Sequence, residues 1–218
     1  MTQDFNQKIG FRFSNHTNAD DTLKHEFTRI STTGPKNPAE ITIQDAKLQL
    51  LNTGKYDKIF GVIGAGKEAT VLLARENKTQ QPVCAKVYKF YSSTNRKRVQ
   101  GSKHIKWDEM AEYAAKKEFW NLYAMAETHI PVPAPLELIN NIVIMDFIHA
   151  PHEKTVPAPL LYDASEDLVP DPELFFYQAV EILVQIFLNA HFTHGDYNAH
   201  NLMISESGLI TMDVTQAM

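Results

Sequence analysis

The chain has 218 residues, which is long enough for one large domain or two small lobes. Its hydrophobic content of 44% and charged content of 22% are ordinary for a soluble globular protein, and its net charge of −5 argues against wholesale binding of nucleic acids or membranes. A single cysteine, Cys84, excludes an intramolecular disulfide and a cysteine-based zinc site. Because no membrane span and no secretory signal are visible either, we expect a cytoplasmic protein.

The N-terminal half is predicted to be rich in strands. Residues 1–44 are expected to form a polar tail with little local structure, apart from a short helix that starts within PAEITIQDAKLQLLNTG and ends at Gly54. From Tyr56 to Phe90 the apolar residues follow a strand period and predict three strands, with turns at 64–67 and 77–81. The polar and basic segment 91–106 is predicted to be a solvated loop.

A long amphipathic helix is predicted next, at residues 107–130. Glu118 lies within its apolar stripe, where a carboxylate is unfavourable unless it is paired. The helix therefore predicts a cationic partner for Glu118. The residues that form the stripe are Trp107, Met110, Ala111, Ala114, Leu122 and Met125.

Two extended segments, 130–139 and 141–148, precede a proline-rich connection. Asp171 and Pro172 then form a typical helix start, an N-cap followed by proline at the first helical position. The helix that follows, up to residue 190, is apolar on nearly every face and is predicted to be buried. Residues 201–214 predict a β-hairpin with Gly208 in its turn. This order, a β-rich half followed by a helical half, favours a phosphate site between the two halves.

Two features of the first half favour binding of phosphates. The segment GAGKEA, residues 64–69, lies between two predicted strands, where its glycines let backbone N–H groups approach a phosphate, although a plain hairpin turn fits equally well. It does not match a Walker A loop. Lys86 lies in the apolar strand VCAKVY, either as an outward-facing lysine or as the partner of Glu118. A strand lysine paired with a helix glutamate is the arrangement that kinases use to hold nucleotide phosphates.

The second half carries the residues for catalysis. Asp196 and Asn201 have the D-x-x-x-x-N spacing of a kinase catalytic loop, in which the aspartate accepts a proton and the asparagine holds a metal ion. Asp213 in the predicted hairpin adds a carboxylate ligand suited to Mg²⁺. Zinc binding by the nearby histidines is disfavoured by their irregular spacing, and His194 is expected to be a hydrogen-bonded structural residue. Cys84 is expected to be a small buried residue.

These segments together resemble one known family. The stretches GAGKEATV, AKVYKF, KKEFWNLYAMAETHIPVPAPLE, VIMDFI, THGDYNAHNLMI and MDVTQAM resemble the RIO family of atypical serine/threonine protein kinases, most closely its first group, over roughly residues 45–218. The resemblance implies an α+β, bilobal protein-kinase-like fold. Residues 45–148 would form an N-lobe with an antiparallel sheet, one main helix and the hinge. Residues 149–218 would form a reduced, mostly helical C-lobe.

The resemblance also implies a role for each motif residue. Lys86, Asp196 and Asp213 would be catalytic, with Asn201 and Asp213 as ligands of Mg²⁺ or Mn²⁺, and Asp213 as a transient phosphate acceptor that gives ATPase behaviour. Backbone atoms of Asp146 and Ile148 would bind the adenine edge. The full set implied to bind ATP is Gly64, Ala65, Gly66, Lys67, Glu68, Val71, Lys86, Glu118, Met145, Asp146, Ile148, Met203 and Met212.

The sequence also departs from the family pattern. Gly64 and Ala65 stand where a Ser-Thr pair is usual, and Tyr197 replaces a common leucine. Family members normally continue into further helices beyond the position of Met218, so we expect either a truncated chain or a minimal version.

Two other functions stay open at this point. One is a small-molecule kinase of the aminoglycoside/choline type, and the other is a nucleotide-gated scaffold that docks on a ribosome-assembly particle. The expected partners are ATP and a protein substrate or such a particle, with no membrane and no sequence-specific nucleic acid.

Overall fold

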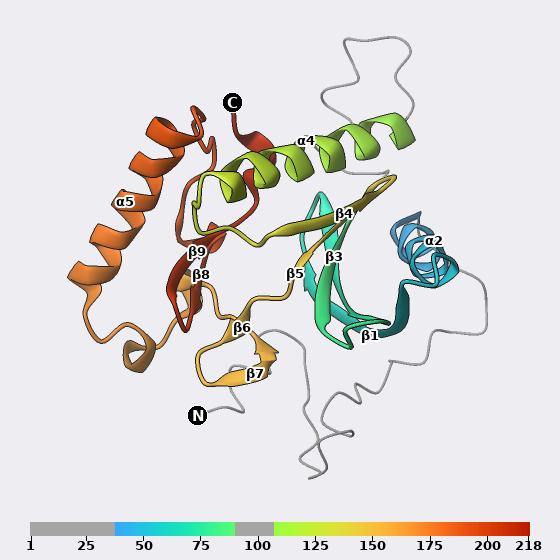
Figure 1. Cartoon of the computed structure of the whole chain (residues 1–218), viewed down its shortest axis with the longest axis horizontal. Coiled ribbons are helices and arrows are strands. Elements are labelled where there is room, and N and C mark those ends of the chain that lie inside the picture. The colour runs from blue at the N-terminus through green and yellow to red at the C-terminus, as the bar shows by residue number, and fades with distance from the viewer. Residues whose placement is uncertain (1–37, 90–106) are drawn as a thin grey trace.

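The computed structural model describes residues 38–89 and 107–218. Its first part is a five-stranded antiparallel sheet in the order β1-β2-β3-β5-β4 (Figure 1). The strands are β1 (Tyr56–Ala65), β2 (Ala69–Glu76), β3 (Pro82–Tyr88), β4 (Pro135–Ile139) and β5 (Ile142–Asp146). All five lie in the segments predicted to be extended. The predicted loop at 91–106 and most of the predicted tail at 1–44 lie outside the described residues.

Two helices pack on this sheet, α2 (Pro38–Asn52) and α4 (Trp107–Glu127). Side chains alternate between the faces of a strand, so Val83, Ala85 and Val87 of β3 face the cluster that contains α2. Tyr88 faces the cluster that contains α4 instead. Lys86 has the same parity as Tyr88, which places it on the α4 side of the sheet.

The second part combines one α-helix with two small hairpins. The helix is α5 (Pro172–Asn189), and the hairpins are β6 (His149–Ala150) with β7 (Glu153–Pro157) and β8 (Leu202–Ser205) with β9 (Gly208–Thr211). Short 3₁₀ turns complete it: η1 (Leu161–Asp163), η2 (Glu166–Leu168), η3 (Ala199–Asn201) and η4 (Val214–Gln216). The sequence prediction missed the β6–β7 hairpin, because strands of two and five residues are too short to show a period.

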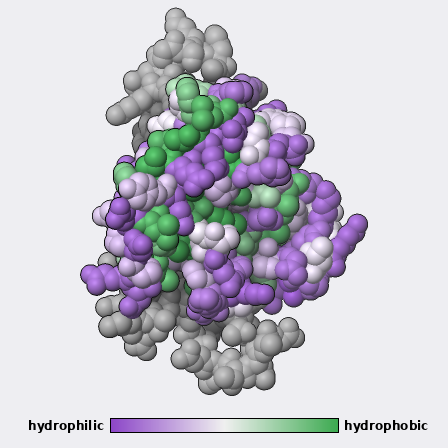
Figure 2. Space-filling model, turned by 60° about the vertical axis from the view of Figure 1, so that its left-hand side comes forward, coloured by the Kyte–Doolittle hydropathy of each residue, from purple (hydrophilic) through white to green (hydrophobic). Residues whose placement is uncertain are grey.

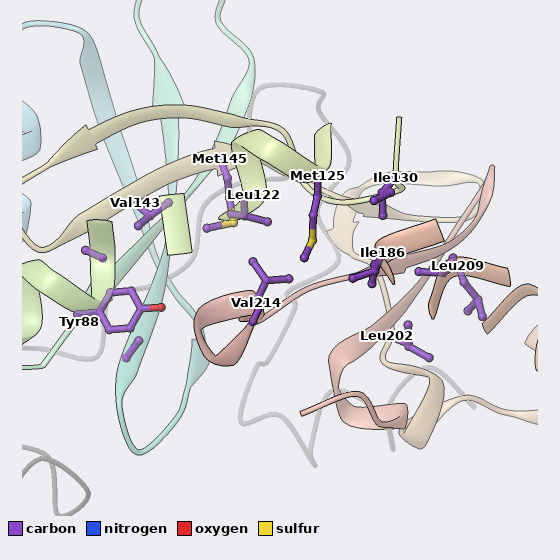
Figure 3. Close-up of a cluster of buried hydrophobic side chains, with 14 of the residues drawn as sticks. Tyr88, Leu122, Met125, Ile130, Val143, Met145, Ile186, Leu202, Leu209 and Val214 are labelled. Carbon is purple, nitrogen blue, oxygen red and sulfur yellow. The ribbon is translucent and has the colours of Figure 1, made fainter. Parts of the chain in front are cut away.

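One hydrophobic cluster joins the two parts. It contains Met125 of α4 and Val143 of β5 together with Ile186 of α5 and Leu202 of β8. In Figure 3, Val214 lies among the side chains of Leu122, Met125 and Ile186, and it is fully buried. The segment that follows Asp213 is therefore packed at the junction of the two parts.

Helix α5 begins as predicted but is not buried as predicted. The Asp171 carboxylate caps it by accepting a hydrogen bond from the Leu174 N–H at 3.0 Å. Of its residues only Ile182 and Ile186 are buried. The prediction was wrong because, within the described part of the chain, packing elements cover one face of the helix only. Figure 2 turns the side of α5 forward and shows separate apolar areas among polar ones. The exposed apolar side chains of α5 are Leu174, Phe176, Tyr177, Val180, Leu183, Val184, Phe187 and Leu188.

Within residues 38–89 and 107–218, no helix has the length and apolar character needed to cross a membrane.

Adjacent residues of α5 provide a test of this packing. Ile186 is fully buried, whereas Phe187 is 62% exposed. Ile186→Ala is expected to lower the free energy of unfolding by about 2–4 kcal/mol, because it removes buried methyl groups and leaves a cavity. Phe187→Ala is expected to lower it by less than about 1 kcal/mol, as is usual for surface changes. Urea unfolding of the two variants measures this, and equal losses would contradict the orientation of α5.

Candidate active site

The side chain of Lys86 forms a buried ion pair with Glu118. Its Nζ lies 2.8 Å from Oε1 and 2.7 Å from Oε2 of Glu118, which is 1% exposed. Glu118 projects from the same face of α4 as Leu122 and Met125, which are also buried. The cationic partner predicted for Glu118 is therefore confirmed, and it is Lys86.

Asp213 joins the same lysine from the C-terminal part of the chain. Its Oδ1 lies 3.1 Å from Nζ of Lys86. Its backbone adopts the left-handed region, with φ of 57°, at the point where β9 gives way to η4. Three segments, β3, α4 and the β9–η4 junction, thus converge on one ammonium group.

The pKa values reflect this convergence. Burial disfavours the charged form of Lys86, but the two carboxylates outweigh it and raise the pKa of the ammonium. Burial likewise disfavours the ionised form of Asp213, yet the adjacent Lys86 ammonium and its hydrogen bond hold the pKa of Asp213 below the ordinary value. Lys86 is therefore cationic and Asp213 anionic at neutral pH.

His194 is a structural residue, as predicted. It is 1% exposed, its Nδ1 accepts the Asp196 N–H at 3.4 Å, and its Nε2 lies 3.1 Å from the Met212 carbonyl. A carbonyl cannot donate, so Nε2 carries the proton and the ring is the neutral Nε2–H tautomer. Burial lowers the pKa of His194, which favours this neutral form. The imidazole thereby connects the backbone before Asp213 to the backbone of Asp196.

Gly195 brings the loop that carries Asp196 against η4. Its φ is +80°, and a Cβ at this position would lie 2.7 Å from the carbonyl oxygen of Gln216. Such a distance is far below van der Waals contact with a backbone atom. Glycine is needed here both for its backbone conformation and for the close approach of the two segments.

Asn201 and Asp196 are joined directly. The Asn201 amide donates to the Asp196 carbonyl at 2.8 Å and to Asp196 Oδ2 at 3.1 Å. Asn198 donates to the other carboxylate oxygen of Asp196 at 2.9 Å. The carboxylate of Asp196 is held by two amides and is solvent-exposed. It is therefore oriented while keeping access for a substrate.

Asn201 also lies next to the Asp213 segment, because the Met212 N–H donates to the Asn201 carbonyl at 2.9 Å. An amide oxygen and a carboxylate are hard ligands of the kind that Mg²⁺ prefers, and two protein ligands suffice where phosphates and water supply the rest. Among the described residues, no cluster of three or more His, Cys, Asp or Glu could hold a metal ion. The donor types of Asn201 and Asp213 fit Mg²⁺.

A cavity of about 720 Å³ contains nearly all the residues predicted from sequence. It is lined by Lys86, Asp196, Asp213 and every residue implied to bind ATP, from Gly64 in β1 to Met212 before Asp213. Asn201 is absent from this lining and lies behind Asp196. The roles assigned to these residues stay predictions, but their convergence on one cavity is a property of the structure.

Sequence reasoning missed part of the lining. Thr155, Val156 and Pro157 of β7 form part of the wall, which follows from the missed hairpin. Cys84, expected to be buried, is only partly buried and lines the cavity. Tyr88 and Thr215 also line it, although both lie inside stretches that carry the family resemblance. Their place in those stretches was the signal from which these two residues could have been predicted to line the site.

Substitution of Gly195 tests the close approach to η4. Gly195→Ala is expected to destabilise the protein by about 2–4 kcal/mol, because it adds a clash with Gln216 to the strain of a left-handed alanine. Gly54→Ala is the matched control, since Gly54 has a φ of +67° but nothing within 4 Å of its added Cβ. Urea unfolding compares the two, and equal losses would show that strain alone matters.

The neutral ring of His194 predicts a dependence of stability on pH. The pKa of His194 is lowered in the folded state below its ordinary value of 6.5, so the unfolded chain binds the proton first as the pH falls. The stabilising contribution is present above about pH 6.5 and is lost as the pH falls through the folded-state pKa. Unfolding free energy measured from pH 7.5 to 5.0 should fall more steeply for wild type than for His194→Asn. His191→Asn, which removes an exposed imidazole, is the control for the loss of a histidine.

Known proteins share this sequence pattern. The RIO domain family model matches residues 65–218. Curated relatives include serine/threonine-protein kinase RIO3 of Caenorhabditis elegans, 28% identical over 181 residues, and serine/threonine-protein kinase rio1 of Dictyostelium discoideum, 30% identical over 185 residues. Each alignment covers 78% of this chain, but 34% and 30% of those proteins. The chain thus spans about a third of the length of these relatives.

Solved structures share the fold. The Rio2 kinase–ADP/Mg²⁺–phosphoaspartate complex from Chaetomium thermophilum aligns with a TM-score of 0.56 at 21% identity, covering 82% of this chain and 52% of that chain. A second Rio2 kinase structure from that organism gives a TM-score of 0.54 at 19% identity and covers 82% and 65%. The predicted α+β, kinase-like fold is therefore confirmed. Because the RIO domain match extends over well more than half of the 218 residues, the chain belongs to the RIO family.

Proposed function

We propose that this chain is an ATP- and Mg²⁺-dependent phosphotransferase, a RIO-type serine/threonine protein kinase. The observation that carries the proposal is the convergence of Lys86, Glu118, Asp196 and Asp213 on one cavity. These residues come from four segments that are distant in sequence. Phosphoryl transfer depends mainly on positioning and on neutralising charge, which is what such a set supplies. Membership of the RIO family, whose relatives above are named protein kinases, supports the same conclusion.

The adenine end of the cavity lies at the segment that follows β5. The N–H of Asp146 donates to Ala134 at 3.0 Å, and the carbonyl of Ile148 accepts from the Ala158 N–H at 2.9 Å. We assign the Asp146 carbonyl and the Ile148 N–H to the ligand. One acceptor and one donor complement the amino group and ring nitrogen of adenine. Val71, Met145, Met203 and Met212 supply the apolar walls.

The phosphate end lies between the β1–β2 turn and Lys86. In the turn, the Gly66 N–H bonds the Ala69 carbonyl at 2.9 Å, so this amide is already used within the turn. Gly64 and Ala65 carry no hydroxyl, so contacts from this part of the loop are restricted to the backbone. Lys86 supplies a cation for the phosphates, and Glu118 holds it in place while they bind.

Asn201 and Asp213 would hold the Mg²⁺. Held there, Mg²⁺ would supply positive charge against the negative charge that develops on the transferred phosphoryl group. Donation from the Asn201 amide nitrogen to Asp196 orients the amide, so its oxygen is directed by the same bonds that orient the catalytic carboxylate.

Asp196 would receive the proton of the attacking hydroxyl. In the proposed step that hydroxyl oxygen forms a bond to the γ-phosphorus, the bond to the β–γ bridging oxygen breaks, ADP leaves, and the proton passes to Asp196. Two amide hydrogen bonds, one to each oxygen, orient the Asp196 carboxylate and leave lone pairs free to accept the proton.

Transfer to Asp213 is the second use that we propose for this site. The related Rio2 structure contains a phosphoaspartate together with ADP and Mg²⁺. The lowered pKa of Asp213 keeps its carboxylate ionised and hence nucleophilic. Hydrolysis of that acyl phosphate by water would make the chain an ATPase and supports use as a nucleotide-gated module on a ribosome-assembly particle.

RIO family membership favours a protein hydroxyl over the aminoglycoside or choline alternative as acceptor. We also propose, from the sequence, that the acceptor is a protein and that the location is cytoplasmic.

ATP turnover tests the function directly. Asp196→Ala is expected to lower kcat by about 10³-fold, because it removes the positioned base. Nucleotide affinity should change by less than about threefold, since Asp196 faces the acceptor rather than the nucleotide. Labelled ATP with Mg²⁺, traced into protein and into water, measures both. Asp167→Ala is the control, because Asp167 is an exposed aspartate of η2 outside the cavity lining.

Two outcomes would contradict the proposal. Unchanged turnover in Asp196→Ala would contradict the role of Asp196 as the base. Absence of turnover by the wild type would contradict the proposed activity. Label that is hydroxylamine-sensitive in wild type and absent in Asp213→Asn would identify the acyl phosphate.

A further inference from the structure

The hydroxyl group of Thr215 lies at the centre of the charged site without belonging to the set of catalytic residues. Its Oγ1 is 3.0 Å from Glu118 Oε2, 3.3 Å from Asp213 Oδ1 and 2.7 Å from the hydroxyl of Tyr88. It therefore contacts both carboxylates that hold Lys86. Among the described residues, Lys86 is the only other side chain that hydrogen-bonds to both of these carboxylates.

Counting protons sets the direction of these bonds. The hydroxyl of Thr215 has one proton, and an ionised carboxylate only accepts. Thr215 therefore donates to Glu118 or to Asp213, but not to both at once. Its remaining lone pairs accept, so the Tyr88 hydroxyl is the donor in the 2.7 Å contact. The Tyr88 hydroxyl therefore donates to Thr215, and the Thr215 hydroxyl donates to a carboxylate.

The backbone around Thr215 is held independently of its side chain. Asn121, one turn after Glu118 on α4, donates through its amide to the Val214 carbonyl at 2.8 Å. Val214 is fully buried in the cluster that joins the two parts of the molecule. At the other end of this segment, Met218 exchanges backbone hydrogen bonds of 2.8 and 3.0 Å with Thr193. The hydroxyl of Thr215 is thus presented from a fixed position.

We infer that Thr215 is a positioning residue for phosphoryl transfer. Its hydroxyl is oriented by Tyr88, and its single proton is donated either to Glu118 or to Asp213. This inference rests on the proposed function. Donation to Glu118 satisfies a carboxylate that has almost no access to water. Donation to Asp213 becomes available when Lys86 turns from Asp213 to the phosphates, and it then replaces the hydrogen bond that Asp213 loses. Thr215 keeps the carboxylate of Asp213 aligned through that exchange.

Paired substitutions at Thr215 separate the hydroxyl from the side-chain shape. Thr215→Val keeps the branched shape and removes the hydroxyl, and we expect kcat to fall by about tenfold or more, the size expected for a hydrogen bond to a charged group. The KM for ATP should stay within about threefold, because Thr215 acts on the alignment of Asp213. Thr215→Ser retains a hydroxyl and should recover kcat to within about threefold of wild type.

Thr211→Val is the matched control. Thr211 is fully buried at the end of β9, and its hydroxyl has no hydrogen-bond partner among the described residues. The same change of side chain there should leave kcat within about twofold of wild type. Thr215→Val with wild-type kcat, or Thr215→Ser as slow as Thr215→Val, would overturn the inference.

A double-mutant cycle with Tyr88→Phe tests the pair separately from the activity. The urea midpoints of Tyr88→Phe, Thr215→Val and the double variant should be non-additive, with the double variant shifted by less than the two single shifts together. Additive shifts would overturn the Tyr88–Thr215 pair whether or not the wild type turns ATP over. Absence of wild-type turnover, by contrast, would refute the proposed function. The additivity or coupling of the urea midpoints would still show whether Tyr88 and Thr215 interact.

Discussion

The buried ion pair between Lys86 and Glu118 is the constraint on which the rest of the structure depends. Taking two charges out of water is unfavourable by several kcal/mol per ion unless geometry and further hydrogen bonds compensate. Here both carboxylate oxygens of Glu118 lie within 2.8 Å of the lysine nitrogen, and a threonine hydroxyl donates to one of them. Removal of either partner would leave an uncompensated charge in the core. The pair therefore holds α4 and β3 in one relative position, and both of its residues line the cavity.

The C-terminal segment is tied to this pair by packing as well as by charge. Val214 is buried among side chains of α4 and α5, while its neighbours Asp213 and Thr215 point toward Lys86 and Glu118. His194 and Gly195 connect the same segment to the loop that carries Asp196, one through hydrogen bonds and the other through close backbone contact. Asp213 and Asp196 are consequently parts of one unit. A shift of α4 would move both.

Local patterns predicted much of this architecture. The strand period of residues 56–88, the stripe of α4 and the Asp171 cap each follow from interactions between residues close in sequence. The partner of Glu118 was predictable in kind, because a carboxylate in an apolar stripe requires a cation. The exposure of α5 was not predictable. The apolar character of a helix shows which faces could be buried, but not which elements of the described chain pack against them. The β6–β7 hairpin also escaped prediction, since its pairing extends over too few residues to leave a period.

The sequence by itself determined the chemical types at the site: a strand lysine, a helix glutamate, an aspartate and asparagine five residues apart, and a hairpin aspartate. Only the tertiary structure decided that Asp213 shares Lys86 with Glu118, and that Tyr88 and Thr215 enter the same network. The physical reason is that hydrogen bonds depend on distance and direction to within a few tenths of an ångström. Residues 127 positions apart, such as Tyr88 and Thr215, acquire that geometry only when the whole core has packed.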